Sequence, residues 1–353
     1  MITSLRLQNF RSYADKSFEF DSGVNVVFGP NASGKTNLLE AILVLARGSS
    51  YKSKDIDLIA FKKPWARLDG VFDTGVRTLK LERQTDTVNK NFIIADKPYK
   101  RLSLQHTFPV VLFEPNHLQL ITRGPDQRRQ WLDELLERTT PGFKILSSRY
   151  YRALAQRNHL LKRGPAHGAS QLFVWDVRLG ELGAQIAVAR ADFIKQINTK
   201  LSRSYSQIAQ KKSTAKVEYA SQFPPDNYAS RLVSKLGATA TTDFERGFTG
   251  HGPHREDILF YLNKQPLLAA ASRGETRSLL LVLKILELEQ IEKARAQRPI
   301  FLLDDVFSEL DDSRRKALVE HLSGYQTIIT TTDADILPTK LLKSRNRIKL
   351  ALG

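Results

Sequence analysis

The residue types and spacing of one short stretch near the N-terminus predict phosphate chemistry. The stretch fits the pattern G-x-x-x-x-G-K-[ST] and consists of Gly29, Pro30, Asn31, Ala32, Ser33, Gly34, Lys35 and Thr36. Its two glycines allow the backbone to curl so that successive N–H groups point at phosphate oxygens. Lys35 is expected to reach the β- and γ-phosphates, and Thr36 to place its hydroxyl on Mg²⁺. The sequence therefore predicts a P-loop that binds ATP and Mg²⁺.

The residues on either side of this stretch support the same interpretation. Residues 24–28 form a short apolar run that is typical of a buried strand, and residues 37–45 have the composition of a helix. A helix that starts directly after the loop adds its N-terminal dipole to the phosphate site. The loop is therefore expected to join a strand to a helix, as a P-loop requires.

A second acidic stretch is expected to complete the nucleotide site. Residues 300–304 form a hydrophobic strand that ends in Asp304, and Asp305 follows directly. A buried parallel strand of this kind carries a carboxylate to Mg²⁺ beside a P-loop. We expect Asp304 to hold the metal together with Thr36. Asp305 is expected to orient or deprotonate the attacking water, so that Asp305 and Lys35 are the predicted catalytic residues.

Two further stretches follow the order expected of a particular ATPase class. Ser272, Arg273, Gly274 and Glu275 open a long predicted helix, whose first N–H groups can bind a phosphate. The sequence Ser-Glu-Leu-Asp at 308–311 follows the acidic strand closely. The order of P-loop, helical region, Ser-x-Gly-x helix start, acidic strand and Ser-x-Leu-Asp is that of the ABC-type ATPases.

The composition limits the class of protein. The chain has 353 residues, of which 41% are hydrophobic, so it is long enough for two domains or for one domain with a large insertion. It contains no cysteine, which excludes disulfides, thiolate metal sites and a cysteine nucleophile. We see no targeting signal near Met1 and no apolar run approaching the ~20 residues of a membrane span. We therefore expect a soluble, cytoplasmic protein without a membrane partner.

The charge balance predicts a polyanionic partner. Lys and Arg number 54 against 37 Asp and Glu, a net charge of +17. Residues 138–216 hold 15 of the basic residues and only 3 acidic ones. Because no amphipathic anchor accompanies this charge, DNA is a better candidate than a membrane. The residues that we select as DNA contacts are Arg128, Arg129, Lys211 and Lys212.

Hydrophobic periodicity predicts an α/β fold with a helical insertion. Apolar alternation or apolar runs predict strands at 2–7, 16–20, 24–28, 110–113, 258–262, 300–304, 326–331 and 347–350, with 110–113 a central strand. Helices are expected at 143–161, 273–296 and 314–322, and Asp126 is a plausible N-cap. Leu172, Trp175, Leu179, Leu182, Ile186, Ala189 and Phe193 form a heptad seam, which favours a helical hairpin. Residues 1–124 and 250–353 are expected to form the ATPase head, and 125–249 a basic, mainly helical insertion.

These motifs together resemble the RecF family, relatives of the SMC ATPases. The resemblance rests on Asn9-Phe10-Arg11-Ser12-Tyr13, the P-loop with Asn37-Leu38-Leu39-Glu40-Ala41, Gly124-Pro125-Asp126-Gln127-Arg128-Arg129, Gly252-Pro253-His254-Arg255-Glu256-Asp257, the Ser272 stretch and residues 304–311. It covers nearly the whole chain. It implies an ABC-type, SMC-like P-loop ATPase head with an inserted helical lobe. It also implies ATP held between two copies, with Ser272 and Gly274 of one copy on the γ-phosphate bound to the other.

The resemblance further implies a function in DNA replication and recombinational repair. A member of this family is expected to form an ATP-dependent homodimer that clamps double-stranded and gapped DNA. It is expected to work with RecR and RecO, to help load RecA, and to hydrolyse ATP slowly. Arg11 is expected to reach the nucleotide, since it follows the first strand near the P-loop. His254 and Arg255 are assigned to the dimer interface, to DNA or to a structural turn, and the sequence alone leaves these alternatives open.

Four features depart from other ABC ATPases. Glu275 stands where Gln is usual and cannot donate an amide N–H. Asp305 stands where most of these ATPases have Glu, and residues 330–333 replace the switch histidine of transporters with Thr-Thr-Thr-Asp. The glutamine of a Q-loop is not evident, and the candidates for its position are Glu114, Asn116 and Gln119.

Two rival classes remain as alternatives. The first is an ABC-type motor subunit of another system, such as a transporter, against which the basic insertion and the missing histidine count. The second is a small-molecule P-loop kinase, which would need an acceptor pocket but no Ser-x-Gly helix start. Membrane association would favour the first alternative over the DNA-binding interpretation.

Overall fold

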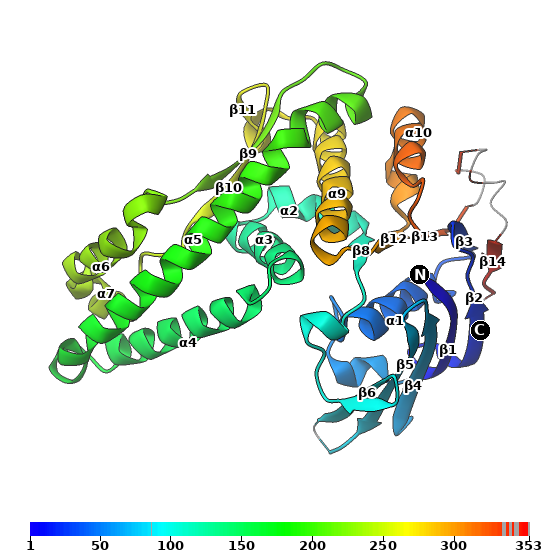
Figure 1. Cartoon of the computed structure of the whole chain (residues 1–353), viewed down its shortest axis with the longest axis horizontal. Coiled ribbons are helices and arrows are strands. Elements are labelled where there is room, and N and C mark those ends of the chain that lie inside the picture. The colour runs from blue at the N-terminus through cyan, green and yellow to red at the C-terminus, as the bar shows by residue number, and fades with distance from the viewer. Residues whose placement is uncertain (86, 334–336, 339–340, 342–345, 352–353) are drawn as a thin grey trace. The chain divides into compact units, whose positions relative to one another are not determined.

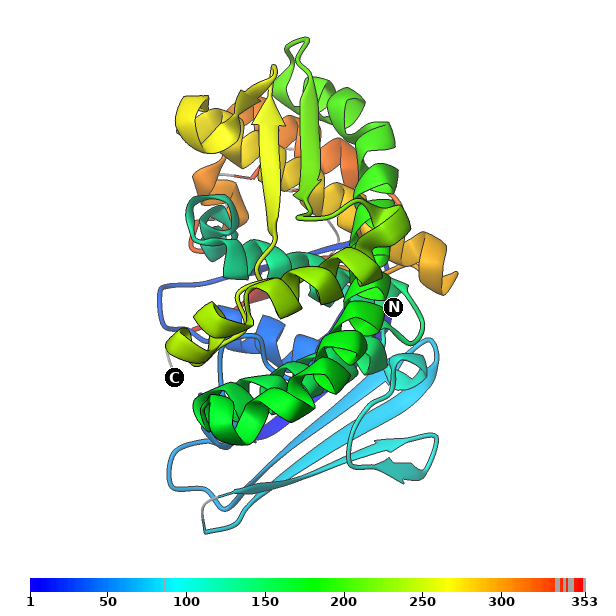
Figure 2. The ribbon, with the colours of Figure 1, turned by 90° about the vertical axis from the view of Figure 1, so that its left-hand side faces the viewer.

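The computed structural model describes residues 1–351 except 86, 334–336, 339–340 and 342–345. The described chain forms two compact units (Figures 1 and 2). The first comprises Met1–His117, Gln207–Gln210 and the chain from Leu280 onward, and the second comprises Leu118–Ser206 and Lys211–Leu279. The second unit therefore extends about thirty residues beyond the predicted insertion boundary at 249.

The first unit contains an antiparallel sheet with the strand order β2-β1-β4-β5-β6-β7. Its strands are β1 (Ile2–Phe10), β2 (Tyr13–Glu19), β4 (Trp65–Phe72), β5 (Gly75–Arg83), β6 (Val88–Ile94) and β7 (Lys97–Tyr99). In β1 the buried side chains are Ile2, Leu5, Leu7 and Phe10, and the pairing with β4 is irregular between Ile2 and Ser4. One face of this sheet is therefore packed against the core while the other is polar.

The same unit contains a parallel sheet with the order β14-β3-β13-β12-β8. Its strands are β3 (Val24–Phe28), β8 (Val110–Phe113), β12 (Ile300–Asp304), β13 (Thr327–Thr331) and β14 (Asn346–Lys349). Every residue of β8, β12 and β13 is buried, which explains their unbroken apolar or threonine-rich sequences. The expectation of a central strand at 110–113 is wrong, because β8 pairs only with β12 among the described strands and forms the sheet edge.

Helix α1 (Lys35–Arg47) packs against both sheets of the first unit (Figure 1). Its residues from Leu38 to Ala46 are all buried, and the apolar ones among them join side chains of both sheets in one hydrophobic core. Helix α10 (Asp312–His321) follows β12, and its N-cap Asp311 accepts a hydrogen bond from the Arg314 amide at 2.9 Å. Helix α1, which follows the P-loop directly, is thus held in place by the hydrophobic core of the first unit.

The second unit is mainly helical and carries the short sheet β11-β10-β9. Its elements are α2 (Gln119–Thr122), α3 (Pro125–Thr139), α4 (Phe143–Lys162), α5 (Pro165–Ala209), β9 (Ala215–Ala220), α6 (Tyr228–Ala238), α7 (Ala240–Arg246), β10 (Asp257–Leu262), β11 (Gln265–Pro266) and α8 (Leu267–Ala270). Helix α9 (Arg273–Arg295) begins in this unit, and its residues from Leu280 belong to the first. No helix in the described ranges has both the length and the apolar content that a membrane crossing requires.

Helices α4 and α5 are linked near the turn that joins them by the ion pair between Arg157 and Asp176, and beyond that end the two helices diverge, so α4 does not pack along the whole seam (Figure 1). The seam residues Leu172, Leu179, Leu182, Ile186 and Phe193 are buried, so they form core rather than a free surface. Gly180 of α5 meets helix α6, because a Cβ there would lie 2.7 Å from a Val233 methyl. Asp126 is not the N-cap of α3: Gly124 takes that position and Pro125 the first turn.

Candidate nucleotide-binding site

The parallel sheet brings the two predicted halves of the nucleotide site to one edge. Strand β3 ends at Phe28, directly before Gly29, and β12 ends at Asp304. Both strands pair in parallel with β13, which places Thr330 beside Asp304 and Thr331 beside Phe28. Because the strands are parallel, their carboxyl ends lie together, which is where open α/β sheets bind ligands.

Glycine is required at both ends of the P-loop. Gly34 caps α1 with φ of 95°, a left-handed conformation that side chains disfavour. A Cβ on Gly29 would lie 2.4 Å from the Leu350 carbonyl oxygen, which leaves no room for a side chain. Tyr13, which sequence analysis did not select, donates its hydroxyl to the Gly34 carbonyl at 3.0 Å. The loop is thus held from both sides by strands β1–β2 and the C-terminal segment.

Lys35 lies folded over its own loop. Its ammonium group donates to the carbonyl oxygens of Gly29 at 2.7 Å and Pro30 at 2.8 Å. Burial lowers the pKa of this amino group, while the carboxylates of Asp305 and Asp304 act in the opposite direction. A short rotation of a flexible side chain is therefore enough to exchange two neutral acceptors for charged phosphate oxygens.

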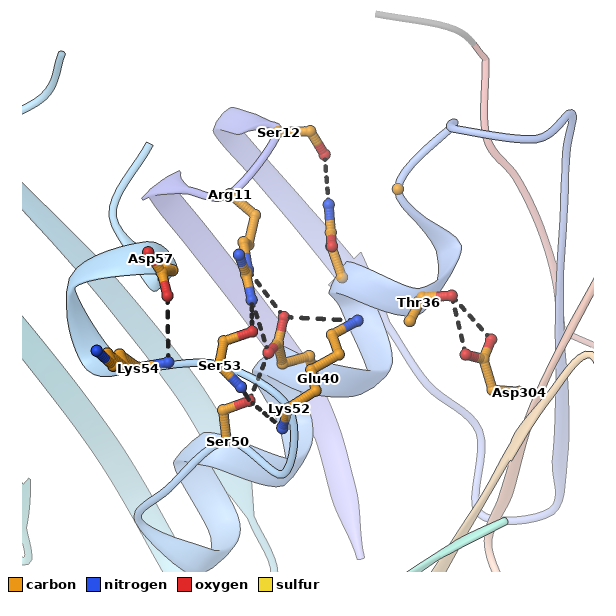
Figure 3. Close-up of polar contacts among 12 residues, drawn as sticks. Arg11, Ser12, Thr36, Glu40, Ser50, Lys52, Ser53, Lys54, Asp57 and Asp304 are labelled. Carbon is orange, nitrogen blue, oxygen red and sulfur yellow. Dashed lines mark hydrogen bonds and ion pairs between the residues drawn. The ribbon is translucent and has the colours of Figure 1, made fainter. Parts of the chain in front are cut away.

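The predicted metal ligands contact each other directly. The Thr36 hydroxyl lies 2.9 and 3.1 Å from the two carboxylate oxygens of Asp304 (Figure 3). Thr330, at the end of β13, donates its hydroxyl to Asp304 at 2.7 Å. In the sequence, Thr330 stood out only as part of residues 330–333, which replace the switch histidine of transporters. A threonine hydroxyl beside a carboxylate supplies the hard oxygen donors that Mg²⁺ prefers.

Asp305 is held in an unusual backbone conformation next to this pair. Its φ is 50°, and its backbone N–H lies 3.1 Å from the Thr330 hydroxyl, so Thr330 orients both aspartates. Burial raises the pKa of the Asp305 carboxyl, Asp304 adds to this, and Lys35 opposes it. A carboxylate with a raised pKa is better suited to accept a proton from water.

Two buried polar atoms at this edge are suited to a ligand. Within the described ranges, Ser33 Oγ and Asp305 Oδ1 are buried and have no hydrogen-bond partner. Buried polar atoms are normally paired, so an unpaired atom beside a Gly-rich loop indicates a missing ligand group. The P-loop amides, Lys35 and Ser33 fit a triphosphate, and Thr36 with Asp304 fits Mg²⁺. Bound Mg²⁺ would supply positive charge that neutralises the phosphate oxygens.

Arg11 is engaged by a carboxylate of α1. Its guanidinium donates two hydrogen bonds of 2.9 Å to Glu40 and a further one to the Ser53 hydroxyl (Figure 3). Ser50 donates to the same carboxylate at 2.6 Å. The burial of Glu40 would raise its pKa, but Arg11 and Ser50 outweigh this and lower it. Arg11 therefore braces α1 in this structure, so that a contact with nucleotide would require it to leave Glu40.

Of the Q-loop candidates, Glu114 and Asn116 lie in the same unit as the P-loop. It follows β8 at the edge that carries Asp304, and Gln119 begins α2 in the second unit. Burial raises the pKa of the Glu114 carboxyl, the Tyr51 hydroxyl bonded to it lowers it, and the negative charge of Asp304 raises it. Glu114 is therefore the candidate whose charge is coupled to the metal-binding carboxylate.

The Ser272 stretch forms a capping box at the start of α9. Ser272 N–H and Oγ–H donate to the Glu275 carboxylate at 2.9 and 3.0 Å, and the Glu275 amide donates to Ser272 Oγ at 3.2 Å. This reciprocal pattern needs Glu or Gln at the third helical position. The departure from Gln at 275 thus has a structural explanation, since the carboxylate accepts bonds here and no amide donor is needed.

We expect Ser272→Ala to lower the free energy of unfolding by about 1 kcal/mol, because it removes both cap bonds of the hydroxyl. Glu275→Gln should cost less than half as much, since an amide oxygen can still accept from the Ser272 amide. Denaturant unfolding followed by circular dichroism measures both variants. Equal stability of Ser272→Ala and the parent chain would show that the capping box contributes nothing.

Two of the predicted DNA contacts are internal instead. Arg128 is 4% exposed and donates two hydrogen bonds of 2.8 Å to the Asp257 carboxylate. Arg129 is also buried and donates to Asp126 and to the Glu256 carbonyl. The expectation that these arginines contact DNA is therefore wrong for this structure. Lys211 and Lys212 are exposed and stay predicted contacts.

The turn at 252–257 ties the second unit together. Arg190 of α5 donates to the Pro253 carbonyl at 2.7 Å and makes a two-bond ion pair with Asp133 of α3. Glu256 accepts a hydrogen bond of 2.8 Å from the buried Tyr228 hydroxyl. At Gly252, where φ is 125°, a Cβ would lie 2.6 Å from the Tyr150 hydroxyl. Of the three roles left open for this motif, these contacts support the structural turn.

His254 is neutral within this turn. Its Nε2 lies 3.1 Å from the Thr249 carbonyl, which can only accept, so Nε2 carries the proton. Nδ1 then accepts from the Tyr150 hydroxyl at 2.7 Å. The pKa of His254 is lowered to about 4, mainly by burial and with a contribution from the positive charges of Arg255, Arg129 and Arg190, while the bond to Thr249 opposes the shift.

This burial predicts a pH-dependent stability. Between pH 6.5, the ordinary pKa of histidine, and about pH 4, the unfolded chain binds a proton that folded His254 does not. The contribution of neutral His254 to the free energy of unfolding is therefore fully present above pH 6.5. It is lost as the pH drops through this window, by about 3 kcal/mol in total. Urea unfolding at pH 7.5 and 5 should show a smaller loss for His254→Gln than for the parent chain. An identical loss in both would contradict the assignment.

The geometry and the comparisons agree on the class of protein. A P-loop and an acidic strand on one edge of a parallel sheet, with a helical insertion and a capped helix between them in sequence, define an ABC-type, SMC-like ATPase head. The family described as the RecF/RecN/SMC N-terminal domain matches residues 1–344. The chain belongs to this family, and within it to the RecF proteins.

Relatives and solved structures match over nearly the full chain. The DNA replication and repair protein RecF of Streptococcus gordonii is 35% identical over 342 residues, covering 95% of this chain and 94% of the relative. RecF of Listeria welshimeri is 34% identical over 364 residues, covering 100% and 98%. A RecF–ATP structure from the RecFOR pathway is 30% identical with a TM-score of 0.85, covering 95% and 92%. An SMC head bound to the C-terminal winged-helix domain of ScpA, at 15% identity and a TM-score of 0.54, shares the fold.

Proposed function

We propose that this protein is an ATP-dependent DNA-binding protein of replication and recombinational repair. It acts as a weak ATPase whose ATP-bound form is a homodimer that clamps gapped or junction DNA. The full-length similarity to RecF proteins supports the process, and the solved RecF–ATP structure supports the nucleotide. RecO-like and RecR-like mediators and a RecA-type recombinase are the proposed partners, and the cytoplasm is the proposed compartment.

The observation that carries the proposal is a nucleotide site with unsatisfied groups. Ser33 Oγ and Asp305 Oδ1 are buried without a partner in the described chain, and the Lys35 ammonium donates to two neutral carbonyls of its own loop. ATP and Mg²⁺ would satisfy these groups from one side. The other face of the nucleotide is proposed to be covered by Ser272 and Gly274 of a second copy, because these residues stand at the N-terminus of α9, where helix N–H groups can bind a phosphate. Dimerisation would then depend on ATP.

Each residue of the nucleotide site has a separate role in the proposed slow hydrolysis of ATP. Lys35 neutralises charge on the phosphates, and Thr36 with Asp304 holds the metal. Asp305 accepts the proton of the attacking water, and Thr330 positions Asp305 by binding its amide. The side chain of Asp305 is one methylene shorter than the Glu of most ABC ATPases, which changes its reach to the attacking water. Slow hydrolysis would keep the ATP-bound dimer closed for longer than in a motor protein.

The net charge of +17 supports DNA as the partner of the dimer. Contacts to phosphates release counterions, so the affinity for DNA should fall steeply as salt rises. Lys211 and Lys212 are the predicted contacts that the structure leaves exposed. Arg128, Arg129 and Arg190 each pair with one acidic residue and Arg157 pairs with two, so these buried arginines add nothing to the excess positive charge.

A salt titration tests the proposed function. We expect the affinity for gapped DNA in the presence of ATP to fall by at least about tenfold between 50 and 200 mM salt. Lys211→Ala combined with Lys212→Ala should reduce the slope of log affinity against log salt by up to about two for each subunit of the dimer. Fluorescence anisotropy with labelled DNA measures both. An affinity that is independent of salt, or independent of ATP, would exclude an ATP-gated clamp on phosphates.

A further inference from the structure

An exposed aromatic side chain stands on a turn of the first unit that the nucleotide site does not use. Phe61 is 85% exposed, which is exceptional for a phenylalanine, since this residue is usually buried. Trp65, four residues later at the start of β4, is 40% exposed. Two aromatic rings in contact with water within five residues of each other need an explanation other than packing.

The turn that presents Phe61 is anchored on both sides. The Lys63 amide donates to the Ala60 carbonyl at 3.0 Å, and the Ala60 amide donates to the Asn9 carbonyl at 2.8 Å. Just before the turn, Leu58 and Ile59 are buried in the core. Phe61 is therefore held outward by ordered backbone on either side.

The anchoring continues into the helix that follows the P-loop. The Arg11 amide donates to the Leu58 carbonyl at 2.9 Å. The Arg11 side chain makes its ion pair with Glu40 of α1, and Ser50 supports the same carboxylate (Figure 3). The turn thus rests on β1 and, through Arg11, on α1.

The chain segment on either side of Phe61 carries basic side chains, of which Arg67 is ion-paired with Asp69. Between Asp57 and Asp69 the chain carries Lys62, Lys63 and Arg67 and no acidic residue. Lys62 has φ of 59°, and its ammonium lies 5.4 Å from the centre of the Phe61 ring. Lys62 and Lys63 are both exposed. An aromatic ring with lysines beside it is the combination by which proteins bind single-stranded nucleic acid, where the ring stacks on a base and the lysines contact phosphates.

We propose that Phe61 stacks on an unpaired base of gapped or junction DNA, while Lys62 and Lys63 contact the flanking phosphates. Trp65 supplies a second ring for the neighbouring base. This inference rests on the proposed DNA-binding function and names the part of the DNA that this turn recognises. A hydrophobic protein partner is the less suitable occupant, because the two lysines beside the ring would lose their hydration against an apolar surface.

Single substitutions in the full-length chain test the inference. Phe61→Ala removes the ring, and Phe61→Tyr keeps a ring of similar size. Phe173→Ala is the matched control, because Phe173 is 68% exposed on α5 in the second unit. Affinity is measured with ATP for a blunt duplex and for the same duplex with a single-stranded gap that contains 2-aminopurine, whose fluorescence reports stacking.

Phe61→Ala is expected to bind the gapped duplex roughly tenfold more weakly and to lose the 2-aminopurine signal, with the blunt duplex unchanged. Phe61→Tyr and Phe173→Ala should bind both DNAs as the parent does. If the parent binds gapped DNA tightly and Phe61→Ala leaves affinity and signal unchanged, the inference is overturned while the proposed function stands. A parent chain that binds neither DNA would overturn both.

Discussion

Lys35→Ala is expected to lower the affinity for ATP by about 100-fold and to abolish ATP-dependent dimerisation. The ammonium of Lys35 is buried and already bonded to two carbonyls of the P-loop, so it needs only to turn toward phosphate oxygens. Hydrogen bonds to a charged group contribute about 1.5–3 kcal/mol each, and two of them account for the expected loss. Folding should be little affected, because the bonds that are lost join Lys35 to its own loop.

Lys35→Arg should also prevent dimerisation, because a planar guanidinium does not fit the space of a compact ammonium. Titration calorimetry gives the ATP affinity, and light scattering gives the mass with and without ATP. Lys97→Ala is a suitable control, since Lys97 is an exposed lysine of β7 in the same unit. Dimerisation of either Lys35 variant at the ATP concentration that suffices for the parent would contradict the assigned role of Lys35.

Asp305→Asn is expected to reduce ATP turnover by about 10²–10⁴-fold and to leave the ATP-bound dimer intact. Asparagine keeps the size of the side chain and the backbone bond to Thr330, but it cannot accept a proton from water. The partly buried carboxylate that is replaced has a raised pKa, as expected of a base. The variant should therefore accumulate as a closed dimer with a longer lifetime than the parent.

A phosphate-release assay and the decay of the dimer after ATP removal measure the two effects. Asp304→Asn gives the necessary contrast: it weakens the pairing with Thr36 and Thr330, so it should impair nucleotide binding as well as turnover. Turnover of Asp305→Asn at the parent rate would remove Asp305 as the base. A variant that cannot dimerise would instead assign it to nucleotide binding.

The parts of the site that lie close together in sequence could be predicted. The P-loop is a contiguous motif, and Asp304 ends a strand whose apolar run marks it as buried and parallel. Tyr13 and Thr330 were not selected, because they reach the site from other strands and no spacing in the sequence connects them to Gly34 or Asp304. Only the strand order of the sheets brings them there.

The arginines of α3 show what residue type alone does not reveal. Arg128 precedes Leu132 by four residues and Leu135 by seven, so it shares the apolar face of the helix. That periodicity is a signal of burial, which the interpretation as a basic patch overlooked. The partner Asp257 is 129 residues away in sequence, so the ion pair itself could not be foreseen.

The capping box at Glu275 shows a limit of comparing residues with a motif. Against the Gln of other ABC ATPases, Glu275 was a departure without an explanation. Its bonds to Ser272 depend on the exact residue at which α9 starts, and helix ends are the least predictable part of an element. The local geometry therefore supplied a role that the sequence pattern left open.

The molecular mass in solution tests the central claim most directly. Sedimentation velocity or light scattering of the parent chain with Mg²⁺, with and without ATP, should show a monomer of 40.0 kDa that shifts to twice that mass only when ATP is present. Gapped DNA should join the heavier species in the ATP sample alone. A mass that stays at the monomer with saturating ATP, or a dimer that forms equally well without it, would contradict an ATP-gated clamp.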